Sequence, residues 1–276
     1  MGRPLLSLVF ALGCGLGGAA LSGCGGASDG PPPPLGRHFQ DSYIAALPVD
    51  QQADIIKAQN EFNIAQREKA KAEADLRESQ LTLDVAKNEA KAAKLDEESA
   101  RSNLKAAEAS ADQNRINDAT RQKRGAELAK NAADERVKYY TAYRDWLKRL
   151  MRFTEENTYW REAQYELAKA RLAQKNNIAP AGFRYDDYVR QESDRAKRTD
   201  GAKRKAEELK GKAGDARSRW LVIQNEADKT LGKQSQFPDP MSPKPVQGTD
   251  PTVGSSGTTI GGGTTDQIAP ADGGAQ

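Results

Sequence analysis

Apolar residues recur at alternating intervals of three and four along a stretch that begins near Asp50. No glycine or proline interrupts this stretch before Gly125, and Asp50, shortly after Pro48, is placed to cap the first helical turn. Fifteen positions follow the spacing and twelve of them are apolar: Phe62, Ala65, Lys69, Ala72, Leu76, Ser79, Leu83, Ala86, Ala90, Ala93, Glu97, Ala100, Leu104, Ala107 and Ala111. Seven heptads of this kind predict a coiled-coil helix.

Most of the apolar positions in this seam are alanine. Alanine has the highest helix propensity and lets helices approach closely. Each buried methyl group contributes only about 0.8 kcal/mol, against about 1.5–3 kcal/mol for a larger apolar side chain. The seam therefore predicts a long thin rod with modest cohesion per residue. A single charged helix without a partner is the alternative.

The seam changes phase at residues 112–118 and resumes at Ala119, eight residues after Ala111. It then continues through Gln122, Ala126, Ala129, Ala133, Arg136, Tyr140, Tyr143, Leu147 and Leu150. Because residues 112–118 contain neither glycine nor proline, we expect one continuous helix there, and the tip of a hairpin is the alternative. A helix from Asp50 to Gln174 would be about 190 Å long.

A firmer boundary follows at residues 176–184, which carry Asn, Pro and Gly in the pattern of a turn. The next helix is expected from Tyr185 to Leu231, with Gly232 as its C-terminal cap. Its seam is Ala202, Ala206, Leu209, Ala213, Ala216, Trp220, Ile223 and Ala227. Three internal glycines weaken this helix, so it needs a partner. We therefore expect an all-α fold of long alanine-rich coiled-coil helices, with an antiparallel hairpin turning near Pro180.

Aromatic residues gather on both sides of that turn. They are Tyr139, Tyr140, Tyr143, Trp146, Phe153, Tyr159, Trp160, Tyr165, Phe183, Tyr185 and Tyr188. They could form a partner-binding end of the hairpin or the best-packed part of the core. Packing is favoured, because each aromatic side chain buries a large area.

Two segments flanking the helical domain, residues 50–232, lack such periodicity. Residues 24–49 predict a tether in which a Gly-rich stretch precedes the stiff polyproline run Pro31–Pro34. His38, the only histidine, follows that run without a metal-binding or catalytic partner nearby. Residues 233–276 are rich in Pro, Gly, Ser and Thr and predict a disordered tail.

The N-terminal segment, residues 1–23, has the layout of an export signal. Arg3 supplies a positive charge, an apolar run follows, and Leu21-Ser22-Gly23 leads to Cys24. This segment resembles the type II signal peptide of bacterial lipoproteins, whose lipobox reads Leu, a small residue, Gly or Ala, then Cys. The resemblance implies that the signal peptidase recognises Leu21, Ser22 and Gly23 and cuts before Cys24. It also implies that Cys24 carries a diacylglycerol and, on its amino group, a fatty acid such as palmitate.

Three alternatives compete with this interpretation. The segment could be an ordinary secretory signal in which the cysteine is incidental. It could be a transmembrane anchor, although its apolar run is short and interrupted by glycines. Cys14 could be the lipidated residue, but Leu12 stands where a small residue is expected and little apolar length precedes it.

The resemblance places the protein in the bacterial cell envelope, lipid-anchored and facing the periplasm. In that family an Asp after the cysteine favours retention in the inner membrane. Gly25 stands at that position here, so we expect the outer membrane.

Neither the composition nor the motifs of the chain indicate a catalytic or ligand-binding site. Loss of Arg3 with the signal would lower the formal net charge from +3 to +2, and this near-neutral balance disfavours a nucleic-acid partner. The basic clusters Lys148-Arg149 with Arg152 and Lys203-Arg204-Lys205 have acidic neighbours and are interpreted as solvated helix faces. No zinc-ligand spacing, phosphate-binding loop or dinucleotide fingerprint occurs. We therefore expect no enzyme activity, metal, cofactor or small-molecule substrate.

The sequence favours a membrane-anchored structural or adaptor lipoprotein that projects a coiled coil into the periplasm for scaffolding or spacing. Its expected partners are the membrane, through the N-terminal lipid, and either a second copy, through the alanine seam, or another coiled-coil protein. The alternative is a binding module, such as an accessory of an export or efflux assembly or a periplasmic holdase chaperone.

Overall fold

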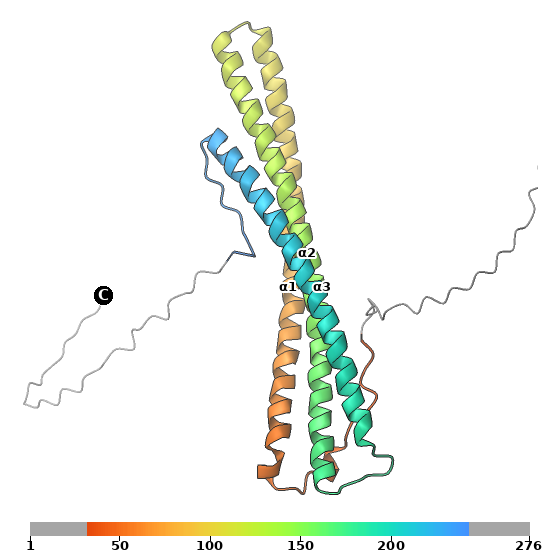
Figure 1. Ribbon diagram of the computed structural model, residues 1–276. Coiled ribbons are helices and arrows are strands. Elements are labelled where there is room, and N and C mark those ends of the chain that lie inside the picture. The colour runs from red at the N-terminus through yellow and green to blue at the C-terminus, as the bar shows by residue number, and fades with distance from the viewer. Residues whose placement is uncertain (1–31, 243–276) are drawn as a thin grey trace, which may run out of the picture. The chain divides into compact units, whose positions relative to one another are not determined.

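The structure is a computed structural model that describes residues 32–242 of the 276-residue chain. Three long helices, α1 (Ala53–Ala109), α2 (Gln113–Lys175) and α3 (Tyr185–Leu231), make up most of it (Figure 1). Two short 3₁₀ helices, η1 (Asp41–Tyr43) and η2 (Val49–Gln52), precede them. The predicted all-α fold is confirmed, and all five elements belong to one unit that ends at Gln236.

Helix α2 is the centre of this unit. It runs antiparallel to both α1 and α3 and packs along each of them, whereas α1 and α3 make little contact with one another (Figure 1). At 1.5 Å per residue the three helices are about 85, 95 and 70 Å long, in chain order. The unit is therefore a rod of two helical hairpins that share α2.

The alanine seam of α1 faces α2 of the same chain. Fourteen of its fifteen positions are buried or half-buried, and the exception is Ala111. Polar contacts fix the register: Thr158 donates to the carbonyl of Ala65 (3.2 Å), and Arg136 pairs with Glu89 (2.6 Å). The seam is thus covered within one chain, and it offers no free surface for the self-association that the sequence suggested.

The predicted continuous helix at residues 112–118 is wrong, because the chain reverses at residues 110–112. Ala111 adopts a left-handed conformation (φ 52°), which costs an alanine about 1–2 kcal/mol. The Asp112 carboxylate caps α2 by accepting from the N–H groups of Asn114 (2.9 Å) and Arg115 (3.3 Å). The rod is consequently about half as long as the 190 Å expected for a single helix.

The second turn and the end of α3 follow the prediction. Residues 176–184 reverse the chain, with Asn177 (φ 54°) and Gly182 (φ 77°) in left-handed conformations. Gly232 (φ 62°) ends α3 with its N–H bonded to the carbonyl of Asp228. Every predicted seam position of α3 is buried or half-buried.

Helix α1 begins differently from the prediction. Asp50 lies inside η2, and no side-chain hydrogen bond caps the first turn of α1. The entry to α1 is instead held by Gln52, whose Nε2 donates to the carbonyl of Leu47 (2.8 Å).

The aromatic residues mostly pack, as favoured, but in two separate groups. Tyr139 stacks on Trp220 in the α2–α3 interface, with ring centroids 5.4 Å apart. Phe39 and Phe183 make an edge contact near the second turn, with centroids 5.7 Å apart. One group thus lies within the α2–α3 interface and the other beside the second turn.

The α1–α2 hairpin extends beyond α3 (Figure 1). Gly125 marks the level at which α3 ends, because a Cβ atom there would clash with the side chain of Leu231. In the register of the Arg136–Glu89 pair, Gly125 lies opposite Ala100. Residues 100–124 are called the tip below. They project about 18 Å past the end of α3.

Candidate functional site: the docked N-terminal segment

The residues predicted to carry the lipid anchor, Cys24 and its recognition residues Leu21, Ser22 and Gly23, lie outside the described residues. The first described residues, 32–44, are therefore the part of the described chain that follows the predicted anchor most directly. They are called the docked segment below.

The docked segment runs along α3 toward the second turn (Figure 1). Arg195 donates from Nη2 to the carbonyls of Pro33 (2.7 Å) and Pro34 (3.1 Å). One turn away, Gln191 exchanges two hydrogen bonds with the backbone of Arg37 (2.9 and 3.0 Å). Gln191 and Arg195 are four residues apart and so lie on the same face of α3. This face therefore presents hydrogen-bonding side chains at regular intervals along the extended docked segment.

The docking corrects the predicted boundary of the flexible tether. Residues 24–49 were expected to be free, but Leu35, Phe39 and Ile44 are buried, with 4–6% of their surface exposed. The physical reason is that a polyproline segment carries unpaired carbonyl groups, which Arg195 satisfies, and that apolar side chains follow it.

A buried ion pair on α2 grips the middle of the docked segment. Glu166 accepts from the N–H of Phe39 (2.6 Å), and Lys169 donates to the carbonyl of the same residue (3.2 Å). Lys169 also pairs with Glu166 (2.7 Å) and with Asp41 (2.9 Å). Both side chains of the pair are at most 6% exposed. Glu166 and Lys169 thus hold both backbone groups of one residue, and the phenyl ring of Phe39 fills the space beside Phe183 and Tyr188.

Burial and hydrogen bonding compete at this ion pair. Burial alone would lower the pKa of Lys169, but its hydrogen bonds to Glu166 and Asp41 outweigh burial and raise that pKa above its ordinary value. Burial raises the pKa of Glu162, and the nearby charge of Glu166 adds to this effect, although His38 opposes it. The site therefore keeps Lys169 charged and disfavours a further negative charge.

His38 belongs to the docked segment and contacts both α2 and α3. Its carbonyl accepts from the hydroxyl of Tyr188 (3.4 Å), and its Nδ1 lies 4.0 Å from Glu166. The imidazole is half exposed. It lies at the rim of the ion pair, beside the carboxylates.

A second buried carboxylate ties α2 to α3 above the docked segment. Glu156 is 1% exposed and accepts from Arg152 (3.0 Å) and from Arg198 (2.9 Å). Arg195 lies over the ring of Tyr159 with 5.2 Å to its centroid. Arg152 is therefore part of the interface and not of a solvated face, whereas Lys203, Arg204 and Lys205 are exposed as expected.

This arrangement binds and positions the chain. Within residues 32–242, no group of three or more His, Cys, Asp or Glu side chains could hold a metal ion. None of the described helices is long and apolar enough to cross a membrane. Sequence reasoning missed Glu166, Lys169 and Arg195, although charged residues among seam-like alanines are a signal that could have pointed to them.

Replacing Lys169 with methionine should release the docked segment. The substitution leaves Glu166 buried without its cation, which costs about 3–5 kcal/mol when one partner of a buried pair is removed. Trypsin should then cut after Arg37 much faster than in wild type, as read by mass spectrometry of the fragments. Lys197→Met is the matched control, since Lys197 is exposed and meets only Asp194 at 4.0 Å. Equal cutting rates in all three proteins would show that the Glu166–Lys169 ion pair does not hold the docked segment in place.

Replacing Glu162 with glutamine should stabilise the protein at neutral pH. Because the folded state raises the pKa of Glu162, its contribution to stability is present at low pH and is lost as pH rises through that raised value. Below about pH 4.3, the ordinary value for glutamate, wild type and variant should be equally stable. Thermal unfolding followed by circular dichroism between pH 4 and pH 8 measures the difference. A difference in unfolding temperature between wild type and variant that does not grow with pH would contradict the raised pKa of Glu162.

The chain was compared with protein-family models, with curated proteins and with solved structures. None of the three comparisons gave a match. The function is therefore inferred from the residues and the geometry of the chain itself.

Proposed function

We propose that the protein is a lipid-anchored scaffold or adaptor that projects a helical rod from a bacterial envelope membrane into the periplasm. The docked segment is the observation that carries the proposal. Cys24 precedes Pro32 by eight residues, which span at most about 28 Å. A lipid on Cys24 therefore holds the rod itself close to the membrane surface.

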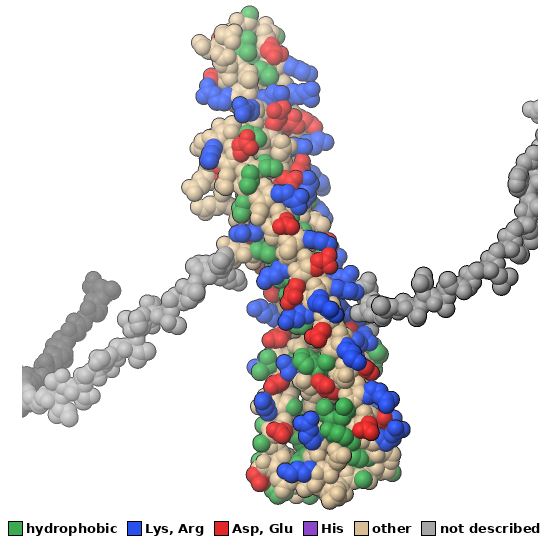
Figure 2. Space-filling model, in the orientation of Figure 1, with side chains coloured by type: hydrophobic (Ala, Val, Ile, Leu, Met, Phe, Trp, Pro, Cys, Tyr) green, Lys and Arg blue, Asp and Glu red, His purple; other side chains and the backbone are tan. Residues whose placement is uncertain are grey.

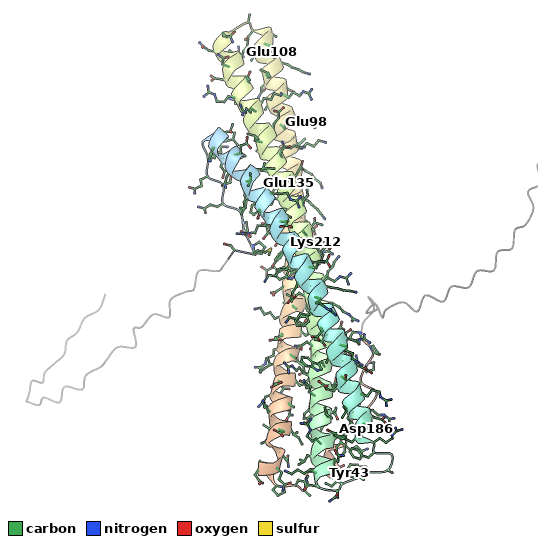
Figure 3. The ribbon with its side chains drawn as sticks, in the orientation of Figure 1. Tyr43, Glu98, Glu108, Glu135, Asp186 and Lys212 are labelled. Carbon is green, nitrogen blue, oxygen red and sulfur yellow. The ribbon has the colours of Figure 1, made fainter. Side chains whose placement is uncertain are left out.

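The docked segment also selects which end of the rod is anchored. It meets α3 at Arg195, ten residues or about 15 Å from the start of that helix. This is the half of the rod that holds the second turn, and the end of the rod at that turn is called the basal end below. Tyr43 and Asp186 lie at that end and Glu108 at the opposite one (Figure 3). With the lipid attached near the basal end, the tip is the part of the rod that can reach farthest from the membrane.

The charge of the tip suits contact with an acidic surface. Residues 100–124 hold six basic and three acidic side chains. Lys and Arg side chains are visible around this end in Figure 2. Within the described structure four of the basic residues form no salt bridge: Arg101, Lys105, Arg115 and Arg124. In the proposed function the tip is accordingly the part of the rod that contacts a partner with an acidic surface.

One observation favours the second candidate, an accessory of an export or efflux assembly. The α1–α2 hairpin with its projecting tip is a feature that such adaptors also have. Their hairpins are flanked by β domains, and no residue from 32 to 242 is in a strand. Pull-down of the lipidated protein from envelope extracts separates these ideas. One stoichiometric export complex supports the accessory, many unfolded clients support a holdase, and neither is expected for a spacer.

Replacing Cys24 with alanine should abolish lipidation. Metabolic labelling with a radioactive fatty acid should mark the wild type and the Cys14→Ala variant but not Cys24→Ala, because the thiol of Cys24 is the proposed acceptor. Undiminished label on Cys24→Ala would overturn the anchor and with it the proposed function.

A further inference from the structure

The outward face of α1 carries a second seam of heptad spacing. It consists of Ala74, Glu78, Leu81, Val85, Asn88, Ala92, Leu95, Ser99, Ser102, Ala106 and Ala109. All eleven residues are exposed, and one of them is charged. Leu81 is 70% exposed, Leu95 65% and Val85 57%. These residues are called the outer seam below.

The outer seam lies opposite the seam that faces α2. Its members follow the buried positions by two residues, as Leu81 follows Ser79 and Asn88 follows Ala86. Two residues turn a helix by about 200°, so the two seams lie on opposite sides of α1. Single exposed apolar side chains are ordinary on a protein surface. A nearly uncharged face that keeps alternating steps of four and three over 35 residues is the pattern of a coiled-coil contact.

We propose that the outer seam binds the outer seam of a second copy of this chain, parallel and in register. The parallel direction rests on the proposed function, because two copies anchored in one membrane point the same way. A strip about 50 Å long and 10 Å wide on each copy would bury roughly 1,000 Å² in total. That area is near the lower limit for a specific interface, about 1,000 Å². The dimer is therefore weak in solution and is favoured where the anchor concentrates the copies.

Charges beside the outer seam fit this parallel pairing. In a parallel coiled coil, Lys91 of one copy stands beside Asp96 of the other, and the symmetry makes this pair twice. Asp84 would face Glu89 in the parallel dimer, but Glu89 is already bound to Arg136 within its own chain. In an antiparallel arrangement the acidic flank that contains Glu89 would meet itself, but Asp84 on the other flank would meet Lys91. The flanking charges are therefore compatible with the parallel dimer, and its direction comes from the shared membrane.

Asn88 supports the register of the dimer. It lies in the middle of the outer seam, between Leu81 and Leu95. A polar residue within a seam favours the register in which it meets its own copy, because a shift by one heptad places its amide against Leu81 or Leu95. In the proposed dimer, Asn88 meets Asn88, Leu81 meets Leu81 and Leu95 meets Leu95.

Disulfide trapping in membranes that contain the full lipidated protein tests the dimer. Leu81→Cys and Leu95→Cys should each give about tenfold more dimer on mild oxidation than Val222→Cys, because a disulfide needs Cβ atoms about 3.5–4.5 Å apart. Val222 is the matched control, since it is 68% exposed on α3 and lies outside the outer seam. Comparable yields at all three positions would overturn the proposal.

Direction is tested by mixing two differently tagged variants. In the parallel dimer, a Leu81→Cys copy should not be trapped with a Leu95→Cys copy, because 14 residues, or about 21 Å, separate the two levels. A mixed dimer as the main product would mean an antiparallel pair centred on Asn88. Trapping of Leu95→Cys with a different protein, and not with itself, would give the outer seam another partner. Either result contradicts the proposal.

A further variant separates the interface from the fold and from the anchor. Leu81→Lys with Leu95→Lys should abolish trapping at Ala92→Cys while the helical circular dichroism is unchanged. Protein without an introduced cysteine should give no dimer, because under the proposed function the thiol of Cys24 carries the diacylglycerol and cannot form a disulfide. A dimer there would reveal a free Cys24 thiol, which is a failure of the anchor and not of the outer seam. Persistent trapping in the lysine variant would place the contact elsewhere.

Discussion

The packing of α2 between two helices is the constraint on which the rest of this structure depends. One side of α2 meets the alanine seam of α1 and another meets α3, while α1 and α3 hardly touch. Polar side chains of a helix that is covered on two sides lose contact with water, so most of them pair with a neighbouring element. Arg136 reaches Glu89 on α1, Glu156 reaches Arg198 on α3, and Glu166 reaches the docked segment. The buried ion pairs are thus consequences of the position of α2.

The helical seams could be predicted because they depend on local geometry. Side chains three and four residues apart share one face wherever a helix forms, so the inward positions of α1 and α3 followed from spacing alone. The turn at residues 110–112 could not be found in the same way. Alanine at position 111 and Asp112 are compatible with a continuous helix, and the reversal is decided by the packing that α1 and α2 gain against each other. That gain is not local, and it halves the length of the rod.

The docked segment shows the same limit at the candidate site. Its prolines indicated an extended chain, and residues 32–40 form no helix, although η1 follows at Asp41–Tyr43. Its position depends on Glu166 and Arg195, which lie more than 120 residues away in the chain. The buried side chains of Leu35, Phe39 and Ile44 are the local signal that this stretch does more than link two parts. Spacing within the segment cannot indicate which helix receives it.

Docking changes what a lipid at Cys24 could do. A free tether of 26 residues would fix the place of the rod but leave its direction open. A segment held by Glu166, Lys169 and Arg195 leaves seven residues between Cys24 and the docked segment, which enters the bundle in its basal half. The same segment lies against α2 and α3, so it leaves the outer seam of α1 uncovered. Rods that share one direction at one membrane can align that seam along its whole length, and a weak apolar face then suffices for association.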